Sequence, residues 1–172
     1  MIAVLLAIVC LVGGVQSCDL KTSKQDDLIP ERLVGAWYAF YAMPQHFFNR
    51  YSCYNASYTP TSKNKLSLRN IYYDKRNQNI SAPVIDYNSE VTVKKNALEW
   101  KGERAEWDTD YYVFATDYDN FIVLGGCPPE FSPSPLYWVA FRKENVHSKD
   151  QQAAEDALET YNLSLRDFAK TC

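Results

Sequence analysis

Alternating apolar and polar residues divide most of the chain into short strand-like segments. Turn-forming residues such as those at 117–120 separate the segments, and the proline-rich stretch 128–135 cannot hold a β-ladder and is expected to be a loop. Pro83 makes its segment an edge or bulged strand. Eight strands are predicted, at residues 34–43, 51–59, 65–73, 79–93, 97–103, 109–116, 121–127 and 136–143.

The pattern changes after residue 147. Apolar residues then recur at helical spacing, namely Ala154, Ala157, Leu158 and Tyr161. With Ser148 as the N-cap, this stripe predicts a helix over 149–161, followed by an extended segment at 163–171. The fold class is therefore mainly β: an eight-stranded up-and-down antiparallel β-barrel with one C-terminal α-helix packed outside. A barrel of this size has room for one small ligand.

The N-terminal residues have the character of a targeting segment. The first 17 carry no charge, the apolar run at 2–12 is too short to span a bilayer, and residues 15–17 form a small-residue cleavage site. We therefore expect a secretory signal peptide at 1–17 and a single domain at 18–172, with a membrane anchor as the alternative. The predicted location is extracellular, without a membrane span.

The composition of the chain limits the classes of molecule that it is expected to bind. The formal net charge is −3 and no basic stripe occurs, which argues against nucleic acid. Aromatic residues make up 15% of the chain, including 13 Tyr and 4 Trp. This content fits a barrel with an aromatic-lined interior, but an ordinary β core would have it as well.

Cysteine and asparagine positions suggest modifications of a secreted chain. Four cysteines remain after cleavage, Cys18, Cys53, Cys127 and Cys172, and they imply two disulfides in one of three connectivities. None of their spacings is a zinc pattern, and we assign no metal or cofactor. Three Asn-x-Ser sequons predict glycosylation at Asn55, Asn79 and Asn162, each of which must face water if it carries a glycan.

Catalytic motifs are missing from the sequence. It contains two histidines, His46 and His147, and has no Gly-x-Ser-x-Gly elbow, phosphate loop or His-Glu-x-x-His motif. Most carboxylates fall in turns, where solvation is their ordinary role. We assign no catalytic residue and do not expect an enzyme.

Three short motifs occur in order along the chain. Gly-x-Trp opens the first strand, Thr-Asp-Tyr lies about two-thirds along, and an arginine closes the last strand; their residues are Gly35, Trp37, Thr116, Asp117, Tyr118 and Arg142. Together they resemble the signature of the lipocalins over the whole mature length. The stretches 115–127 and 161–172 look like those of cockroach lipocalin allergens. Pro128-Pro129 resembles the cockroach milk lipocalins, which are glycosylated and carry fatty acids.

The resemblance implies a lipocalin calyx and several residue roles. It selects the pairings Cys18–Cys127 and Cys53–Cys172, which leave no free thiol for the chemistry of the lipocalins that are isomerases. The motif residues are expected to be structural, with the Arg142 cation covering the Trp37 indole at the barrel base.

One fixed point per strand predicts which side chains face the cavity, because side chains alternate. On the first strand, Trp37 lies at the base, so Ala39 and Tyr41 should point inward. On the second, a glycosylated Asn55 must point outward, so Tyr54 and Tyr58 should point inward. On the seventh, Cys127 must point outward to reach Cys18, so Ile122 and Leu124 should point inward. Trp138 shares its parity with Arg142, and the family pattern implies that Tyr111, Val113 and Ala115 also point inward. The predicted ligand-binding residues are Trp37, Tyr41, Tyr54, Tyr58, Tyr111, Val113, Ile122, Leu124 and Trp138.

The expected function is to bind and carry a small hydrophobic or aromatic ligand, such as a pheromone, a biogenic amine or a fatty acid. Aromatic walls should narrow the cavity, which favours a semiochemical or aromatic amine over a large pigment, although an amine would need a carboxylate or carbonyl near its charge. One alternative is a nutritive or structural secreted glycoprotein whose cavity is incidental or filled. The other is an enzyme, which an active thiol assay on the purified protein would detect. A weak homodimer and allergenicity are further expectations.

Overall fold

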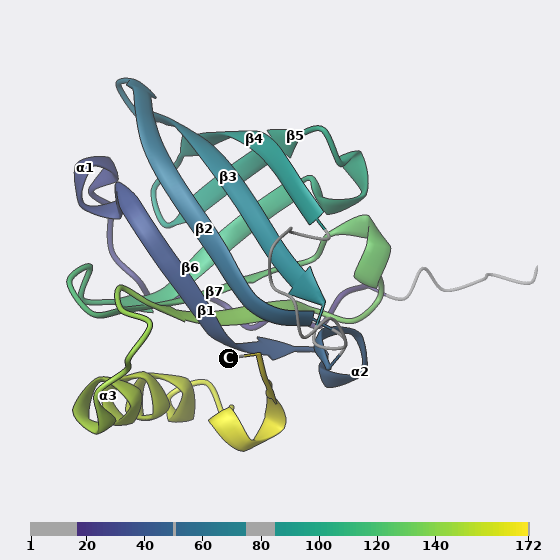
Figure 1. The fold of residues 1–172 in the computed structure, drawn as a ribbon, viewed down its shortest axis with the longest axis vertical. Helices are drawn as coiled ribbons and strands as arrows, with labels where there is room; N and C mark the ends of the chain where they lie inside the picture. The colour runs from purple at the N-terminus through teal and green to yellow at the C-terminus, as the bar shows by residue number, and fades with distance from the viewer. Residues whose placement is uncertain (1–16, 50, 75–84, 172) are drawn as a thin grey trace, which may run out of the picture.

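The computed structural model describes residues 17–49, 51–74 and 85–171. Within them one antiparallel sheet has the strand order β2-β3-β4-β5-β6-β7-β8-β1-β9, and pairing of β1 with β2 closes the first eight strands into a barrel (Figure 1). The strands are β1 (Gly35–Met43), β2 (Tyr51–Ser62), β3 (Lys65–Asp74), β4 (Ile85–Val93), β5 (Ala97–Gly102), β6 (Thr109–Thr116), β7 (Phe121–Gly126), β8 (Leu136–Phe141) and β9 (Ala169–Lys170).

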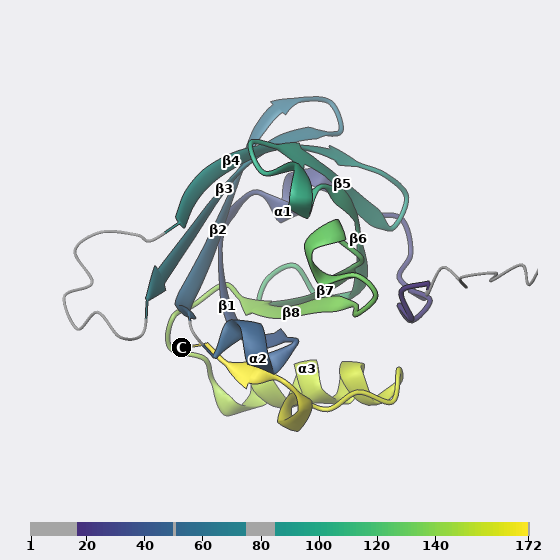
Figure 2. The same ribbon diagram turned by 90° about the vertical axis from the view of Figure 1, so that its right-hand side faces the viewer.

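Helical segments lie at the ends and on one side of the barrel. The long helix is α3 (Ser148–Glu159), which runs outside the barrel and contacts β6 and β7 (Figure 2). The remaining helices are single turns: α1 (Pro30–Leu33), α2 (Gln45–Phe48), η1 (Ala105–Trp107), η2 (Pro129–Phe131) and η3 (Leu165–Asp167). The predicted fold class, a mainly β eight-stranded barrel with one C-terminal helix outside, is confirmed.

Local details differ from the sequence-based expectations. The α3 helix begins at Ser148, and His147 stands at the N-cap position without a side-chain cap hydrogen bond. The predicted strand 79–93 is described only from Ile85 onward. The single turns α1, α2, η1 and η2 fall outside the predicted strands and were not predicted, because one turn of helix leaves no periodic signal in a sequence.

Part of the barrel wall is buried on both faces, so the molecule has one apolar core inside the barrel and a second one outside it. Strand β8 shows this, since all six of its residues are buried. Its inward side chains belong to the core inside the barrel, and these are Leu136, Trp138 and Ala140. Its outward side chains belong to a second core beneath α3, and these are Tyr137, Val139 and Phe141. Continuous apolar runs are typical of strands covered on both sides.

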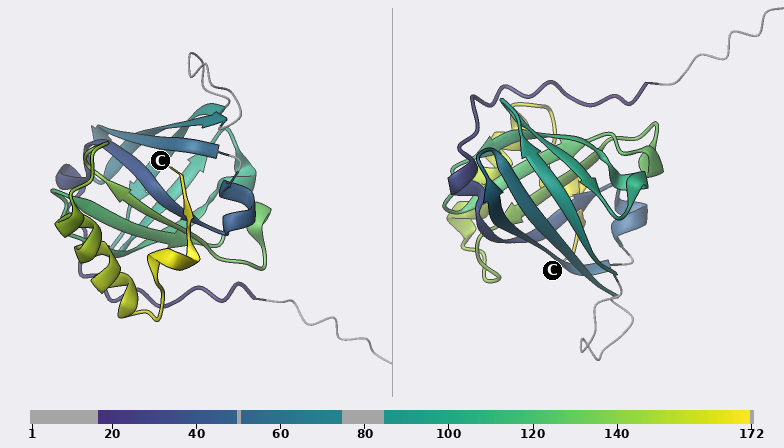
Figure 3. Two further views of the ribbon diagram at one scale, coloured as in Figure 1. Left: turned by 60° about the horizontal axis from the view of Figure 1, so that its bottom comes forward. Right: turned by 90° about the horizontal axis from the view of Figure 1, so that it is seen from above.

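The N-terminal segment runs along the outside of the barrel (Figure 3). A disulfide joins Cys18 to Cys127, which confirms this predicted pairing. The backbone N–H of Lys21 donates to the Tyr137 hydroxyl at 3.1 Å, and that of Lys24 donates to the Tyr161 hydroxyl at 3.1 Å. These contacts hold the segment against the barrel. The Cys53–Cys172 pairing involves a side chain and a residue outside the described part of the chain, and it stays a prediction.

Candidate ligand-binding site

One end of the barrel is sealed by Trp37 and Arg142. The Trp37 side chain is buried and its indole N–H donates to the Leu33 carbonyl at 2.9 Å. The Arg142 guanidinium lies 3.6 Å from the centroid of the Trp37 ring. It also donates to the backbone carbonyls of Tyr118 and Val34, each at 2.9 Å. The cation therefore both covers an aromatic face and satisfies backbone carbonyls.

The other motif residues meet at the same place. Gly35 has φ +104°, and a Cβ there would lie 3.2 Å from an Arg142 guanidinium nitrogen, so glycine serves both the backbone angle and the close approach. The Thr116 hydroxyl accepts from the Tyr118 N–H at 2.9 Å and so shapes the turn whose carbonyl Arg142 reaches. We call the six motif residues, Gly35, Trp37, Thr116, Asp117, Tyr118 and Arg142, the basal cluster.

Asp117 holds the turn of the basal cluster through backbone hydrogen bonds. Its carboxylate accepts from the N–H groups of Asp119, Asn120 and Phe121 at 3.1, 2.8 and 3.0 Å. Burial raises the pKa of the Asp117 carboxyl, but these bonds and one from the Asn120 side chain outweigh burial and leave the pKa below its usual value. The role is structural, as its turn position predicted.

Most of the predicted wall residues lie inside the barrel. They belong to the inner core and are at most 5% exposed, and they are Tyr54, Tyr58, Tyr111, Val113, Ile122, Leu124 and Trp138. Trp37 lies inside at the base. Their contact with a ligand stays a prediction.

Tyr41 is the exception, and its predicted inward position is wrong. The β1–β8 register shifts between Ala39 and Tyr41, so the bulge reverses the alternation and turns Tyr41 into the outer core. A second register shift, between Val113 and Ala115 in β6, likewise moves Ala115 to the outer core. The Tyr41 error comes from extending strict alternation through a bulge, and the Ala115 error comes from applying the family pattern across a second bulge; neither bulge has a clear signal in this sequence.

The interior also contains aromatic residues that the sequence-based analysis did not assign to the site, namely Phe48, Tyr72, Tyr87, Trp100, Trp107 and Phe131. Alternation could have found those on β3, β4 and β5, because Tyr72 shares the parity of Leu66 and Leu68, but no fixed point was available for these strands. Trp107 and Phe131 lie on single turns and had no such signal.

Trp138 lies at the centre of an aromatic cluster. Its ring centroid is 5.2 Å from Tyr111, 5.5 Å from Trp100 and 5.6 Å from Tyr54. Above it, the single turns close the barrel end opposite the basal cluster. Phe131 of η2 meets Trp107 of η1 edge-on at 5.3 Å and stacks on Phe48 of α2 at 6.1 Å. Three single turns therefore contribute buried aromatic side chains to this end of the interior.

Several buried polar atoms inside the barrel have no hydrogen-bond partner in the described part of the chain. These atoms are the Tyr58 hydroxyl, Asn70 Nδ2, Trp100 Nε1 and Trp138 Nε1. The Tyr54 hydroxyl, by contrast, donates to Asn70 Oδ1, and the Tyr111 hydroxyl donates to the Trp107 carbonyl at 3.0 Å. Native interiors rarely leave such groups unpaired, so each needs a physical explanation.

The interior is electrically neutral over the ordinary pH range. Burial raises the pKa of the interior phenols well above the usual value for tyrosine, and these are Tyr54, Tyr58, Tyr72, Tyr87 and Tyr111. The buried acidic residue in the described part of the chain is Asp150, which lies on α3 outside the barrel.

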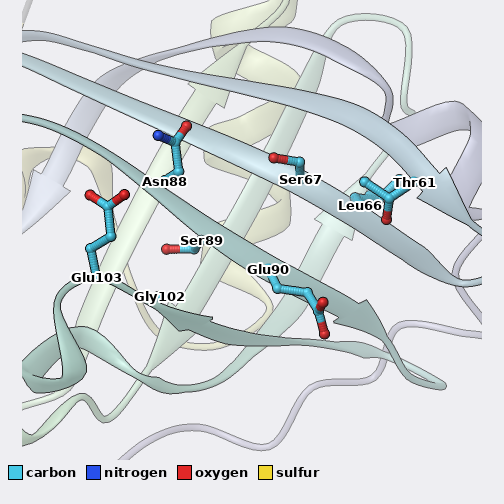
Figure 4. Close-up of a pocket in the computed structure, with 8 residues that line it drawn as sticks. All are labelled: Thr61, Leu66, Ser67, Asn88, Ser89, Glu90, Gly102 and Glu103. Carbon is cyan, nitrogen blue, oxygen red and sulfur yellow. The ribbon is translucent and has the colours of Figure 1, made fainter.

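A surface groove of about 450 Å³ is formed by residues of β2–β5 and the residue after β5, and Figure 4 shows the residues that line it. Most of these residues are of polar type, and they are Thr61, Leu66, Ser67, Asn88, Ser89, Glu90, Gly102 and Glu103. The groove is therefore distinct in chemistry from the aromatic interior. Among the described residues, no helix is both long enough and apolar enough to cross a bilayer.

The predicted glycosylation sites lie in different environments. Asn162 is exposed, directly after α3, with φ +57°. Asn55 is half-buried in β2 between β1 and β3, and its Oδ1 atom is buried. Asn79 lies outside the described residues. Use of the three sequons stays a prediction.

A closed eight-stranded barrel with a basal Trp–Arg pair, an external helix and an enclosed interior is the lipocalin fold. No family model matches the chain. The Lazarillo protein of Schistocerca americana is 23% identical over 175 residues, covering 98% of this chain and 80% of that protein. The predicted resemblance to arthropod lipocalins is confirmed.

Solved structures agree on the fold. The major allergen Per a 4 from cockroaches has a TM-score of 0.74 at 20% identity, covering 91% of this chain and 94% of that chain. The amine-binding protein of Rhodnius prolixus, solved as its tryptamine complex, has a TM-score of 0.68 at 16% identity, covering 90% of this chain and 86% of that chain.

Proposed function

We propose that the protein is a secreted lipocalin that binds and carries a small, mostly apolar molecule inside the barrel. The main observation behind this proposal is that four side chains in an otherwise apolar interior have polar atoms without a partner in the described part of the chain. These side chains are Tyr58, Asn70, Trp100 and Trp138. A solid core gains nothing from such atoms, since each costs about 1–3 kcal/mol when left without a partner. A bound molecule with polar atoms of its own would satisfy them.

Two further observations support this proposal. The Rhodnius prolixus protein of similar fold binds an amine, which is consistent with ligand carriage in this fold. The Cys18–Cys127 disulfide fits an oxidising, extracellular location, as does the predicted signal peptide. Allergenicity, suggested by the similarity to Per a 4, is a further part of the proposal. The proposal includes no catalytic activity.

The rival function is a nutritive or structural glycoprotein whose interior is a filled core. The observation that favours it is the closed aromatic end, where Phe48, Trp107 and Phe131 meet. The two functions differ in what the interior must do. A carrier opens these turns and exchanges its ligand, whereas a structural protein keeps them closed.

The test is quenching of tryptophan fluorescence on titration with tyramine, a fatty acid, biliverdin and the neutral ketone acetophenone, because three of the four tryptophans lie in the aromatic cluster. We expect saturable quenching at micromolar concentrations by at least one of them. Leu124→Trp, which fills the interior, should abolish binding, whereas Tyr41→Phe on the outer face should leave the affinity unchanged. No quenching by any ligand, with no small molecule found by native mass spectrometry of the secreted protein, would contradict carriage.

A further inference from the structure

We propose that the interior selects a neutral ligand bearing a carbonyl oxygen on an aromatic or apolar body, and that it rejects protonated amines. This inference rests on the proposed function and narrows the chemical class of its ligand. It follows from which unpaired atoms the interior presents and from which charges it lacks.

The unpaired groups near the centre of the barrel are hydrogen-bond donors. Trp100 and Trp138 are 2% and 1% exposed, and an indole Nε1–H can donate but cannot accept. Neither N–H has a partner in the described part of the chain. The two rings stack with their centroids 5.5 Å apart, so both donors belong to one cluster.

Asn70 adds a third donor to the same cluster. Its side chain is fully buried, and its Oδ1 atom already accepts from the Tyr54 hydroxyl. The Tyr54 ring in turn stacks on Trp138, at 5.6 Å between centroids. The amide oxygen is thus used within the protein while Nδ2 is not. A ligand entering here therefore meets N–H groups that need an acceptor.

In the part of the barrel that the structure describes, no buried interior side chain offers a counter-charge for a cation. Among the described residues, the buried polar and charged side chains are Asn70, Ser89, Asp150 and Thr171, and Asp150 is on the external helix. At the closed aromatic end, Glu106 is paired with Arg104 at 2.8 Å. Glu130 of η2, at the same end, is exposed, although it acts electrostatically on Tyr87 and Tyr111. The interior phenols also stay neutral, because burial raises their pKa. A protonated amine would therefore be buried without a partner, at high cost in free energy.

A carboxylate ligand fits less well than a neutral carbonyl. Arg142 could offer positive charge, but its guanidinium is held by backbone carbonyls and the Trp37 ring in the basal cluster. Arg104, at the other end, is paired with Glu106. Indole and amide N–H groups can satisfy a carbonyl oxygen without the desolvation of a full charge. A ketone, aldehyde or ester is therefore the class that this interior fits.

The test uses three probes with the same carbon skeleton: acetophenone, ethylbenzene and 1-phenylethylamine. Isothermal titration calorimetry at pH 7 should show acetophenone binding about tenfold more tightly than ethylbenzene, because it satisfies a donor. The protonated amine should bind about a hundredfold more weakly than acetophenone. Equal or tighter binding of the amine would overturn the inference while leaving carriage intact. No binding of any probe would count against the proposed function as well.

Variants assign the effect to named donors. Trp138→Phe and Trp100→Phe each keep an aromatic ring but remove the N–H, so at least one should bring the acetophenone preference over ethylbenzene close to one. Their ethylbenzene affinity should change less than threefold. Tyr161→Phe in the outer core is the matched control and should keep the tenfold preference. Melting curves establish that each variant is folded, and two tryptophan variants keep the test decisive if one does not fold. Retention of the full preference in both would overturn the assignment.

Discussion

The basal cluster and the barrel interior treat polar groups in opposite ways. In the basal cluster, the Trp37 indole N–H is bonded to the Leu33 carbonyl, and Arg142 donates to carbonyls at 2.9 Å while covering the Trp37 ring at 3.6 Å. In the interior, the indole N–H groups of Trp100 and Trp138 have no partner in the described part of the chain. The same residue type is thus hydrogen-bonded at one place and, among the described residues, without a partner at the other.

This difference indicates that the two regions of the barrel have different roles. The basal cluster ties together the ends of three strands and contributes stability, since its donors are satisfied. The interior gives up some stability by leaving donors unpaired, and such local inconsistency is expected at functional sites. Four predictions can break or sharpen this comparison.

The largest effect is expected at alkaline pH and comes from the interior. Five buried phenols have pKa values higher in the folded than in the unfolded state, where the pKa is about 10. Stability should be fully present below about pH 10 and fall as the pH rises, because only the unfolded chain then loses these protons. Each phenol contributes about 1.4 kcal/mol per pH unit, so together they give up to about 7 kcal/mol per unit.

The measurement is urea unfolding at a series of pH values between 8 and 11. Tyr58→Phe should reduce the alkaline slope by about 1.4 kcal/mol per pH unit. A free energy of unfolding that stays constant to pH 11 would show that the phenols are not buried as described.

Removal of the Cys18–Cys127 disulfide should have the next largest effect. The bond closes a sequence separation of 109 residues and fastens the N-terminal segment to the residue after β7. The double variant with serine at both positions should lose about 2–5 kcal/mol of unfolding free energy. A loss below about 1 kcal/mol would contradict a stabilising role.

Arg142 in the basal cluster and Arg104 at the opposite end of the barrel each lie near aromatic rings, so their variants can be compared directly. Arg142→Ala should lower the free energy of unfolding by about 1–3 kcal/mol, through lost packing on Trp37 and lost hydrogen bonds. Arg104 lies farther from its aromatic partners, 5.9 Å from the Trp107 ring and 6.0 Å from the Tyr87 ring, and Arg104→Ala should cost less than about 1 kcal/mol. Thermal melts of both variants measure the difference, and equal losses would argue against the special role of the base.

The smallest effect is expected when interior tyrosine hydroxyls are removed, because the change in stability should depend on whether the hydroxyl has a hydrogen-bond partner. Tyr58→Phe removes a buried hydroxyl without a partner in the described part of the chain and should raise the stability of ligand-free protein by about 1 kcal/mol. Tyr54→Phe removes a hydroxyl bonded to Asn70 and should lower stability by about 1 kcal/mol. Chemical denaturation measures both values. Destabilisation by Tyr58→Phe would mean that its hydroxyl has a partner.

The alternating pattern of the sequence predicted the barrel, and the resemblance of its three short motifs to the lipocalin signature predicted the basal cluster. The cover of Trp37 by Arg142 and the turn at Asp117 were among these expectations, whereas the positive φ of Gly35 emerged only from the structure. The position of Tyr41 could not be predicted, because a bulge reverses the alternation without changing the composition of the strand. The interior positions of Trp107 and Phe131 were not predicted for another reason: both residues lie on single helical turns, and such turns are set by tertiary packing.

The most direct test of the central claim is the proton NMR signal of the indole N–H groups in ¹⁵N-labelled protein, where each of the four tryptophans gives one resonance. Titration with acetophenone should move the resonances of Trp100 and Trp138 downfield as their N–H groups gain an acceptor. The Trp37 resonance should stay in place, because its N–H is already bonded to the Leu33 carbonyl. Saturating acetophenone that leaves Trp100 and Trp138 unmoved, or moves Trp37 as far as them, would contradict a binding interior set apart from a structural base.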